Sequence, residues 1–312
     1  MNELDDISIV IPTLNAGQWL QPLLDALRAQ EPNCPSEMIL VDSGSSDDTL
    51  AIARAHDWVR VVPIDRFSHG GARNRGIREA RGDVVVLMTQ DAIPANPYWL
   101  EKLVEPLKQP EVGAVYSRQV PRSRVSAVEE AFLFDRFPDG PQVVRRPDGE
   151  GIPVYPTTFF SNVSAAARRA TWLDFPFDET LIMSEDQQFA RDILLAGLAI
   201  VYEPASMVLH SHSYGLCETF RRYFDSVVAF RQLSRRHRAA ASAQLGQSTL
   251  GREMIYVARH RPLSLPHYLM HTMAKALGVA IAHGSDRMPL SWCARCSMQP
   301  GWWTRGSGQS ES

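Results

Sequence analysis

The chain has 312 residues, with 32 Lys and Arg against 35 Asp and Glu, and a formal net charge of −3. Its 45% hydrophobic and 21% charged residues are an ordinary globular composition, which excludes a disordered chain, a collagen and a small disulfide-stapled scaffold. A charge this close to zero does not favour a nucleic-acid-binding protein, because such domains usually carry a strong basic excess.

The ends and the cysteines indicate a cytoplasmic protein. Residues 1–6 are polar and acidic, unlike a secretory signal, and no stretch reaches the ~18 apolar residues that span a bilayer. The four cysteines, with no secretion signal, are expected to be free thiols in a reducing compartment. Cys293 and Cys296 form a CxxC in the tail, where neither a redox motif nor a four-ligand zinc site is expected.

Strand and helix signals alternate over the first 116 residues. Short β-branched or apolar runs predict strands at 7–11, 38–41, 59–62, 84–88 and 112–116. Helical spacing or capping residues predict helices over 19–27, after Ser45 or Ser46 with Asp47 and Asp48 in the first turn, and from Asn96 and Pro97. Residues 70–80 are expected to form a loop that enters a helix. This alternation implies parallel strands joined by right-handed crossovers, an α/β fold.

Polar segments follow three of these strands. They are Pro12 to Asn15, Asp42 to Ser45, and Thr89 to Asp91. Ligands of open α/β sheets bind beyond the carboxyl ends of the strands, so these segments predict a nucleotide site at one sheet edge.

The middle of the chain is less regular. Residues 136–156 are rich in Pro, Gly and charge and are expected to form a loop that folds over a ligand as a lid. A helix is predicted over 184–195, with Ser184 and Gln187 as a capping box. Short strands are predicted at 200–202 and 207–209, and helices from about residue 217.

The run from Ser68 to Gly76 places two glycines and two arginines, Arg73 and Arg75, at a helix N-terminus. Free backbone N–H groups and guanidinium groups favour a phosphate there, although an ordinary glycine-containing turn has the same composition. The dinucleotide and P-loop glycine signatures are both missing, which argues against an oxidoreductase.

Acidic and histidine side chains complete the candidate site. Asp91 follows the central strand, where a carboxylate would hold Mg²⁺ or Mn²⁺, although a lone aspartate more often forms a turn. Glu185 and Asp186 begin a helix, whose dipole alone would explain them. His210 and His212 would share one side of a strand and could bind a metal.

The motifs together are more specific than any one of them. In order they read PTLN, VDSGSSDDT, HGGARNRG, TQDA, SNVSAAARR, SEDQQFARD and HSH. Over residues 7–230 this set resembles the inverting family-2 glycosyltransferases, and among them the bacterial rhamnosyltransferases that use dTDP-L-rhamnose. The resemblance implies a GT-A fold, which is a Rossmann-like mixed α/β sheet flanked by helices, here followed by a C-terminal helical extension.

The resemblance also implies a role for each matching residue. Asp186 would be the catalytic base, and Asp91 and His210 would hold a divalent metal, Mg²⁺ or Mn²⁺, on the donor diphosphate. His212 is a neighbouring metal candidate. The nucleotide sugar would contact Pro12, Leu14, Asn15, Asp42, Ser43, His69, Arg73, Gln90 and Asp91.

Two positions depart from the family pattern. Ser43 stands where many members have a second acid, and Gln90 replaces one carboxylate of the DxD motif. Gln90 can hydrogen-bond a ribose but adds no charge to a metal site, so weaker metal dependence is expected.

Several functions stay open at this point. The first is transfer of rhamnose from dTDP-L-rhamnose to a saccharide or lipid-linked acceptor in bacterial surface-polysaccharide synthesis. The alternatives are transfer from a UDP-hexose and nucleotide-sugar binding without catalysis. A glycoside hydrolase would need two carboxylates across one sugar bond but none of the phosphate-binding features.

Two domains are expected. Residues 1–225 would form a catalytic domain, with a nucleotide half at 1–116 and an acceptor half at 117–225. Residues 226–312 would form a basic helical extension. Residues 1–216 carry a net charge of −11, and residues 217–312 carry +8. The tail contains Arg235, Arg236 and Arg238, an apolar stretch over 268–281, and Trp292, Trp302 and Trp303. It either packs as a helical extension or makes a peripheral contact with the inner face of the cytoplasmic membrane.

Overall fold

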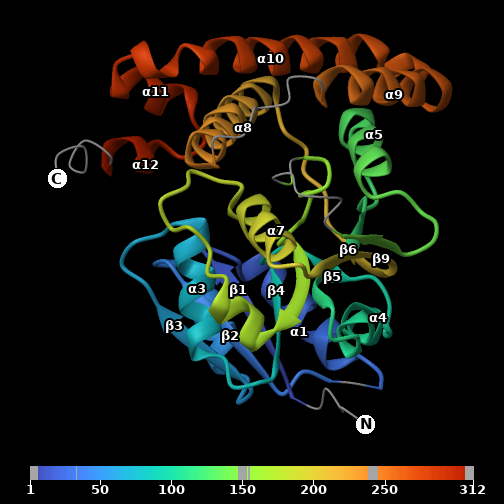
Figure 1. Ribbon diagram of the computed structural model, residues 1–312, viewed down its shortest axis with the longest axis vertical. Coiled ribbons are helices and arrows are strands. Elements are labelled where there is room, and N and C mark those ends of the chain that lie inside the picture. Colours follow the sequence, from blue (N-terminus) through green and yellow to red (C-terminus); the bar gives the residue numbers. More distant parts are fainter. Residues whose placement is uncertain (1–5, 33, 147–152, 154, 238–244, 306–312) are drawn as a thin grey trace. The chain divides into compact units, whose positions relative to one another are not determined.

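The computed structural model describes residues 6–32, 34–146, 153, 155–237 and 245–305, and the chain forms two compact units (Figure 1). The first unit comprises residues 1–122, 137–179 and 185–211, and the second comprises residues 123–136, 180–184 and 212–312. The domain boundary expected after residue 225 falls inside one helix, α8 (Leu216–His237). The division in the structure precedes that helix, and the second unit also includes two short segments from earlier in the chain.

The first unit is built on one mixed sheet, which has nine strands within the described residues. Their order is β3-β2-β1-β4-β8-β6-β9-β5, with β7 pairing β9. They are β1 (Ile7–Thr13), β2 (Glu37–Asp42), β3 (Val59–Pro63), β4 (Val84–Met88), β5 (Ile93–Pro94), β6 (Val112–Val120), β7 (Val143–Arg145), β8 (Ser164–Arg168) and β9 (Ala199–Leu209). β1 to β4 are parallel to one another, β8 is antiparallel to β4 and β6, and β6 is parallel to β9. The mixed α/β fold is as predicted.

Helices flank this sheet. They are α1 (Gly17–Arg28), α2 (Thr49–Arg54), α3 (His69–Glu79), α4 (Trp99–Val104), the 3₁₀ turn η1 (Glu105–Lys108), α6 (Arg169–Asp174) and α7 (Glu185–Leu195). Leu20, Leu23, Leu24 and Leu27 form the buried side of α1, as their spacing predicts. All five residues of β4 are buried, which fits a strand covered on both faces.

The five predicted strands are all present, and β8 is a further strand that the sequence did not predict. Its five residues, SAAAR, contain no β-branched or aromatic side chain, so propensity gives no strand signal. The two strands predicted around Pro204 form one strand, β9, whose pairing with β6 shifts register between Ser117 and Arg118. Part of the expected lid is the edge strand β7, and residues 147–152 and 154 of that lid lie outside the described residues.

Three helices begin later than predicted. α2 begins at Thr49, and Asp47 accepts hydrogen bonds from the backbone N–H groups of Gly17 and Thr49 instead of lying in the first turn. α4 begins at Trp99, after Asn96 and Pro97. α7 begins at Glu185, and the Gln187 N–H donates to Asp186 Oδ1 at 2.8 Å, so the expected capping box is not formed.

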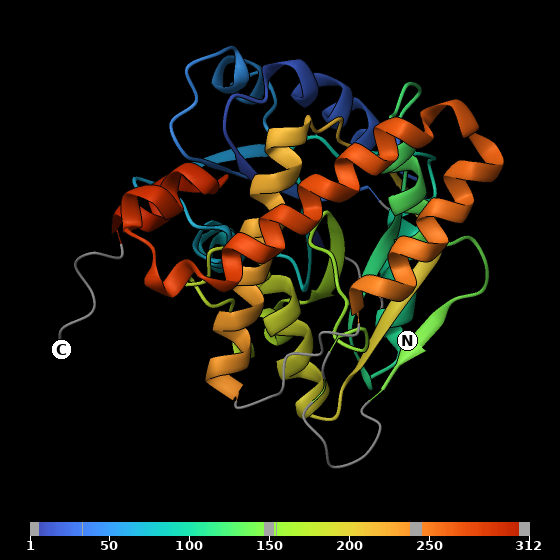
Figure 2. The same cartoon turned by 90° about the horizontal axis from the view of Figure 1, so that it is seen from above.

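The second unit is helical. Its described elements are α5 (Ala127–Arg136), α8, α9 (Leu245–His260), the 3₁₀ turn η2 (Pro262–Ser264), α10 (Leu265–His283), the 3₁₀ turn η3 (Ser285–Arg287), α11 (Leu290–Cys296) and α12 (Pro300–Arg305). Figure 2 shows α10 crossing α8, and a Cβ on Gly278 of α10 would lie 2.4 Å from the Phe220 carbonyl oxygen of α8. Only glycine permits this approach. Within the described residues, no helix combines the length and apolarity that crossing a bilayer requires.

Two of the three tryptophans expected at a membrane surface have partners within this unit, one buried and one half-buried. Trp303 is buried in a cluster with Phe224 and Cys293, and the Trp302 indole N–H donates to the Thr180 carbonyl at 3.0 Å. Arg235, expected in an exposed basic cluster, pairs with Asp286. All four cysteines are free thiols, as predicted.

Candidate active site

The polar segments after β1, β2 and β4 meet at one edge of the sheet, as predicted. The Leu14 N–H donates to Gln90 Oε1 at 2.8 Å, and Gln90 Nε2 donates back to the Leu14 carbonyl at 3.1 Å. Asn15 accepts from the Ser46 N–H at 2.9 Å, and its own N–H donates to Ser45 Oγ at 2.9 Å. These bonds join the three loops and leave the Leu14 side chain 49% exposed.

Two residues assigned to the nucleotide sugar use their polar groups within these loops. The Asp42 carboxylate accepts from the N–H groups of Gly44 and Ser45, at 3.0 Å each. Ser43 Oγ donates to the Thr13 carbonyl at 3.0 Å. Asp42 and Ser43, like Gln90, therefore shape the loops, while Pro12 and Leu14 leave apolar surface at this edge.

Asp91 and His210 come together on neighbouring strand ends. Asp91 Oδ1 lies 3.6 Å from His210 Nε2, and the other ring nitrogen, Nδ1, lies 2.8 Å from Gln119 Oε1. Gln119 Nε2 donates to Ser161 Oγ, so the amide turns its oxygen to the ring. An amide oxygen can only accept, so Nδ1 carries a proton, and Nε2 is the ring nitrogen that faces Asp91.

This donor set fits a divalent metal. Two ligand atoms 3.6 Å apart can both bind one ion at the usual ~2.0–2.3 Å, and a second-shell hydrogen bond that fixes the histidine tautomer is typical of metal sites. A carboxylate and an imidazole suit Mn²⁺, and the carboxylate also suits Mg²⁺.

Arg122 was not identified from the sequence. Its Nη2 lies 3.7 Å from Asp91 Oδ2 and donates to the Asp91 carbonyl, and its guanidinium lies 4.2 Å from the centre of the Trp19 ring. Only its position at the end of β6 could have indicated it, since that strand end shares the site edge.

Arg73 forms a buried ion pair in the structure. Its side chain is buried, and Nη1 lies 2.9 Å from Glu185 Oε1. The first turn of α3 also has close neighbours within the protein. Ser68 Oγ accepts from the Gly71 N–H at 3.0 Å, and a Cβ on Gly70 would lie 2.8 Å from the Asp178 carbonyl oxygen. These glycines therefore permit close packing, which explains them without a phosphate, and the phosphate role of this helix end stays a prediction.

Two other residues between Ser68 and Gly76 also have partners close by in the structure. Arg75 pairs with Glu79 at 2.8 Å along the same helix. The His69 ring packs edge-on against Phe67, with 5.0 Å between ring centres, and its carbonyl accepts from Arg73.

Glu185 and Asp186 are in distinct electrostatic states. Burial alone would raise the pKa of Glu185, but the Arg73 guanidinium holds that pKa below its usual value. Burial, with the negative charge of Glu185, raises the pKa of Asp186 to about 7. A carboxylate with a pKa near neutrality is suited to general base catalysis.

One segment connects these groups. The Asn162 amide lies 3.4 Å from Glu185 Oε1, and the Val163 carbonyl accepts from the Thr89 N–H at 3.2 Å, just before Gln90 and Asp91. Ser161 binds Gln119, the partner of His210. The SNV motif, to which the sequence analysis gave no role, thus joins the strand that carries Asp91 to the residues beside Asp186.

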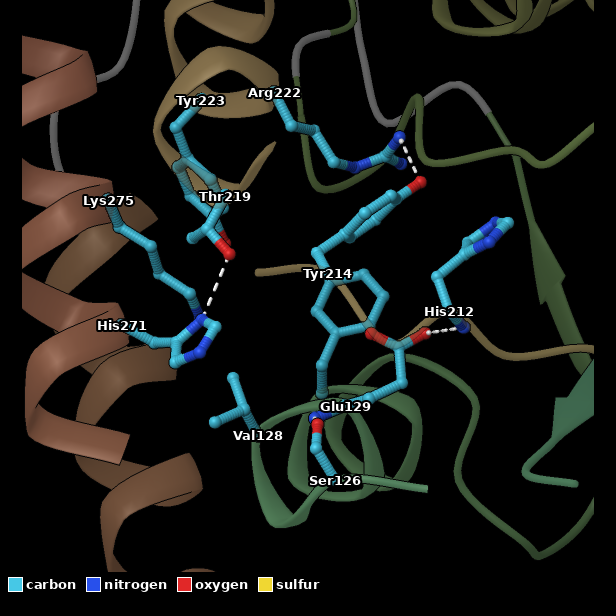
Figure 3. A pocket seen from close by; sticks show the side chains of 11 residues that line it. Ser126, Val128, Glu129, His212, Tyr214, Thr219, Arg222, Tyr223, His271 and Lys275 are labelled. Atoms are coloured by element: carbon cyan, nitrogen blue, oxygen red, sulfur yellow. Dashed lines mark hydrogen bonds between the residues drawn. The ribbon is translucent and has the colours of Figure 1, made fainter. Parts of the chain in front are cut away.

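The second unit contains a pocket of its own, shown in Figure 3. Its lining includes Glu129, whose pKa is raised by burial, and the side chains of Tyr214, Arg222, Tyr223 and Lys275. His212, the second histidine of the HSH motif, lies here; its N–H donates to Glu129 Oε1 at 3.1 Å. Its ring stacks on Tyr214, with 4.9 Å between ring centres.

Comparison with known proteins identifies the family of the chain. A family model described as glycosyl transferase family 2 matches residues 8–165. The O-antigen chain rhamnosyltransferase RfbN of Salmonella typhimurium is 32% identical over 95% of this chain and 96% of its own length. The O-antigen chain rhamnosyltransferase WbaN of Salmonella anatum is 31% identical over 96% of both chains.

Solved structures give the same fold. The mannosyltransferase PcManGT from Pyrobaculum calidifontis, in complex with GDP-Man and Mn²⁺, has a TM-score of 0.57 at 20% identity, covering 97% of this chain and 86% of that chain. A glucosyl-3-phosphoglycerate synthase from Mycobacterium tuberculosis has a TM-score of 0.51 at 23% identity, covering 74% and 78%. The fold is therefore that of the GT-A glycosyltransferases, as expected. The family match and the similarity over almost the full length of two relatives show that the chain is a glycosyltransferase and belongs to glycosyl transferase family 2.

Proposed function

We propose that this glycosyltransferase moves L-rhamnose from dTDP-L-rhamnose, with inversion, to a hydroxyl group of a saccharide or lipid-linked acceptor in bacterial surface-polysaccharide synthesis. The full-length similarity to two O-antigen chain rhamnosyltransferases supports the sugar and the kind of product. The observation that carries the chemistry is Asp186, a half-buried carboxylate whose pKa is raised to about 7 beside an ionised Glu185.

In the proposed reaction, Asp186 is the general base. Its carboxylate takes the proton of the acceptor hydroxyl while that oxygen attacks the anomeric carbon from the face opposite the diphosphate. The new glycosidic C–O bond forms, the bond to the diphosphate breaks, and the leaving group departs as dTDP. Attack from the opposite face inverts the anomeric configuration.

Glu185 and Arg73 are positioning residues in this proposal. The Arg73 guanidinium keeps Glu185 ionised, and that charge helps to raise the pKa of Asp186 toward neutrality, where a base acts most efficiently. Arg73 and His69 would therefore influence the reaction through Glu185, since the structure buries Arg73 in this ion pair.

Asp91, His210 and Arg122 would serve the diphosphate. Asp91 and His210 would hold the divalent cation, which when bound would neutralise charge that develops on the leaving group. Arg122, which Trp19 supports from one side, adds a fixed positive charge beside Asp91.

The loops after β1 and β2 would hold the nucleoside. Pro12 and Leu14 would contact the base, and Asn15, Asp42, Ser43 and Gln90 keep those loops in place through the hydrogen bonds already described.

A donor panel tests this proposal. Thermal unfolding would be followed with dTDP-L-rhamnose, UDP-glucose and GDP-mannose, each with Mg²⁺ or Mn²⁺, because a ligand present above its Kd raises stability by mass action. We expect selective stabilisation by dTDP-L-rhamnose. Preference for a UDP-hexose would replace the proposed donor and leave the family assignment intact.

Product analysis then tests catalysis itself. The anomeric configuration of the product, determined by NMR spectroscopy, should be opposite to that of the donor. Donor binding without transfer to any saccharide or lipid-linked acceptor would favour a nucleotide-sugar-binding protein, and a retained configuration would contradict the single displacement.

A further inference from the structure

Helix α10 places its polar residues inward and its apolar residues outward. His271 and Lys275 are buried, with 3% and 6% of their surface exposed. Figure 3 shows both side chains pointing from α10 toward the pocket. A helix on the surface of a water-soluble protein normally has the reverse arrangement.

The inward polar groups are satisfied, so this orientation of the helix is well determined. Lys275 Nζ lies 3.1 Å from Glu253 Oε2, and both side chains are almost fully buried. His271 Nδ1 lies 2.9 Å from Thr219 Oγ1 of α8. Turning α10 over would leave a buried Glu253 without its cation, which is strongly unfavourable.

The outward face consists of large apolar side chains. Leu269, Met270, Met273 and Leu277 are exposed by 46%, 52%, 72% and 55%, and we call them the outer face of α10. At about 100° per residue, these four positions fall within an arc of roughly 100°. Leu263 of η2, directly before the helix, is 97% exposed. An apolar patch of this kind marks an interaction or membrane site.

The surrounding charge indicates what covers this face. Residues 254–285 contain no Asp or Glu. Arg259 and Arg261 are exposed just before η2 and α10, and Trp292 and Leu290 are exposed on α11. Arg261 pairs with Glu130 of α5 at 3.1 Å, but the segment that carries the outer face has no carboxylate of its own. Apolar residues with cations and an aromatic residue are complementary to an anionic lipid surface. A second copy of the chain would bring the same positive charges together.

We propose that the outer face of α10 and Leu263 dock on the surface of an anionic lipid bilayer, with these side chains inserted at the headgroup boundary. The proposal does not depend on the donor or on the catalytic residues. It narrows the membrane contact expected from the sequence to the stretch over 268–281 and its surroundings, since Trp302, Trp303 and Arg235 have partners within the second unit.

Vesicle flotation with the full chain tests this proposal. Vesicles of phosphatidylglycerol and phosphatidylethanolamine would be compared with vesicles of phosphatidylcholine. The test variant replaces Met270, Met273 and Leu277 by Gln, and the control replaces Leu173 and Leu195 of the first unit, which are 42% and 53% exposed, by Gln. Thermal unfolding of each variant checks that it is folded.

We expect the wild-type chain and the control to float with the anionic vesicles. The α10 variant should float about fivefold less or worse, and ~0.5 M NaCl should weaken wild-type binding severalfold. Equal flotation of the wild-type chain and the α10 variant would overturn the proposal. A wild-type dimer in sedimentation analysis that the α10 variant dissociates, without vesicle binding by either, would overturn it in favour of a second copy.

Discussion

Glu185 and Arg73 are 112 residues apart in the sequence and form a buried ion pair, with 2.9 Å between Glu185 Oε1 and Arg73 Nη1. The pair keeps a negative charge beside Asp186, where burial already disfavours ionisation. Two adjacent acids thus have different properties: Glu185 is an ionised structural partner, and Asp186 titrates near neutrality. The choice of base rests on this difference.

The first prediction concerns pH. Since the ionised form of Asp186 would be the active base, kcat/KM for transfer should rise with pH and level off above about 7. In Glu185→Gln the neighbouring negative charge is lost, so Asp186 ionises more easily and the rising limb should move to lower pH. Initial rates between pH 5 and 9 would give the pH at which kcat/KM rises in the wild-type chain and in Glu185→Gln.

Glu101→Gln, on α4, is the control for the loss of one carboxylate. Its kcat/KM should rise at the same pH as that of the wild-type chain. If kcat/KM of Glu185→Gln rises at the same pH as in the wild-type chain, or at a higher pH, then Glu185 does not set the pKa of the base.

The second prediction concerns the metal. His210→Ala removes one proposed ligand, and Gln119→Leu removes the acceptor that fixes the His210 tautomer. Mn²⁺ affinity in the presence of dTDP should fall about tenfold or more in His210→Ala and about tenfold in Gln119→Leu. Electron paramagnetic resonance of free Mn²⁺ measures this without turnover. His56→Ala, in the turn after α2, is the control, and a similar loss there would discredit the proposed ligands.

The third prediction concerns packing of α3 on the sheet. A Cβ on Gly76 would lie 2.2 Å from Val10 Cγ1 of β1, so Gly76→Ala should destabilise the first unit by about 1–3 kcal/mol or more. Gly251 lies in α9 with nothing within 4 Å of its Cβ position, so Gly251→Ala should stabilise that helix by about 0.5–1 kcal/mol. Thermal unfolding measures both, and equal effects of the two substitutions would contradict this packing.

Much of the first unit could be predicted because its signals are local. β4 is a run of five apolar residues, and parallel strands bring their carboxyl ends to one edge wherever the helices lie. That geometry made it possible to predict that Leu14, Asn15, Asp42 and Gln90 would meet. β8 gave no signal because its alanines have no strand preference and pair with neighbours far away in the sequence.

The partners within the site could not be predicted in the same way. Nothing local indicates that Arg73 binds Glu185 rather than a phosphate, since the two lie on helices that only the tertiary fold brings together. Arg122 and Asn162 were missed for the same reason. The reversed orientation of α10 was hidden because His271 and Lys275 interrupt its apolar pattern and resemble an ordinary solvated face.

The most direct test of the account is the single-turnover rate of rhamnose transfer in Asp186→Asn, compared with the wild-type chain and with Asp192→Asn, which changes a carboxylate on the same helix. Transfer from dTDP-L-rhamnose to the acceptor should fall about 10²–10⁴-fold in Asp186→Asn, while the Kd for the donor and the rate of Asp192→Asn stay near wild type. An Asp186→Asn rate within severalfold of wild type would contradict the assignment of the base.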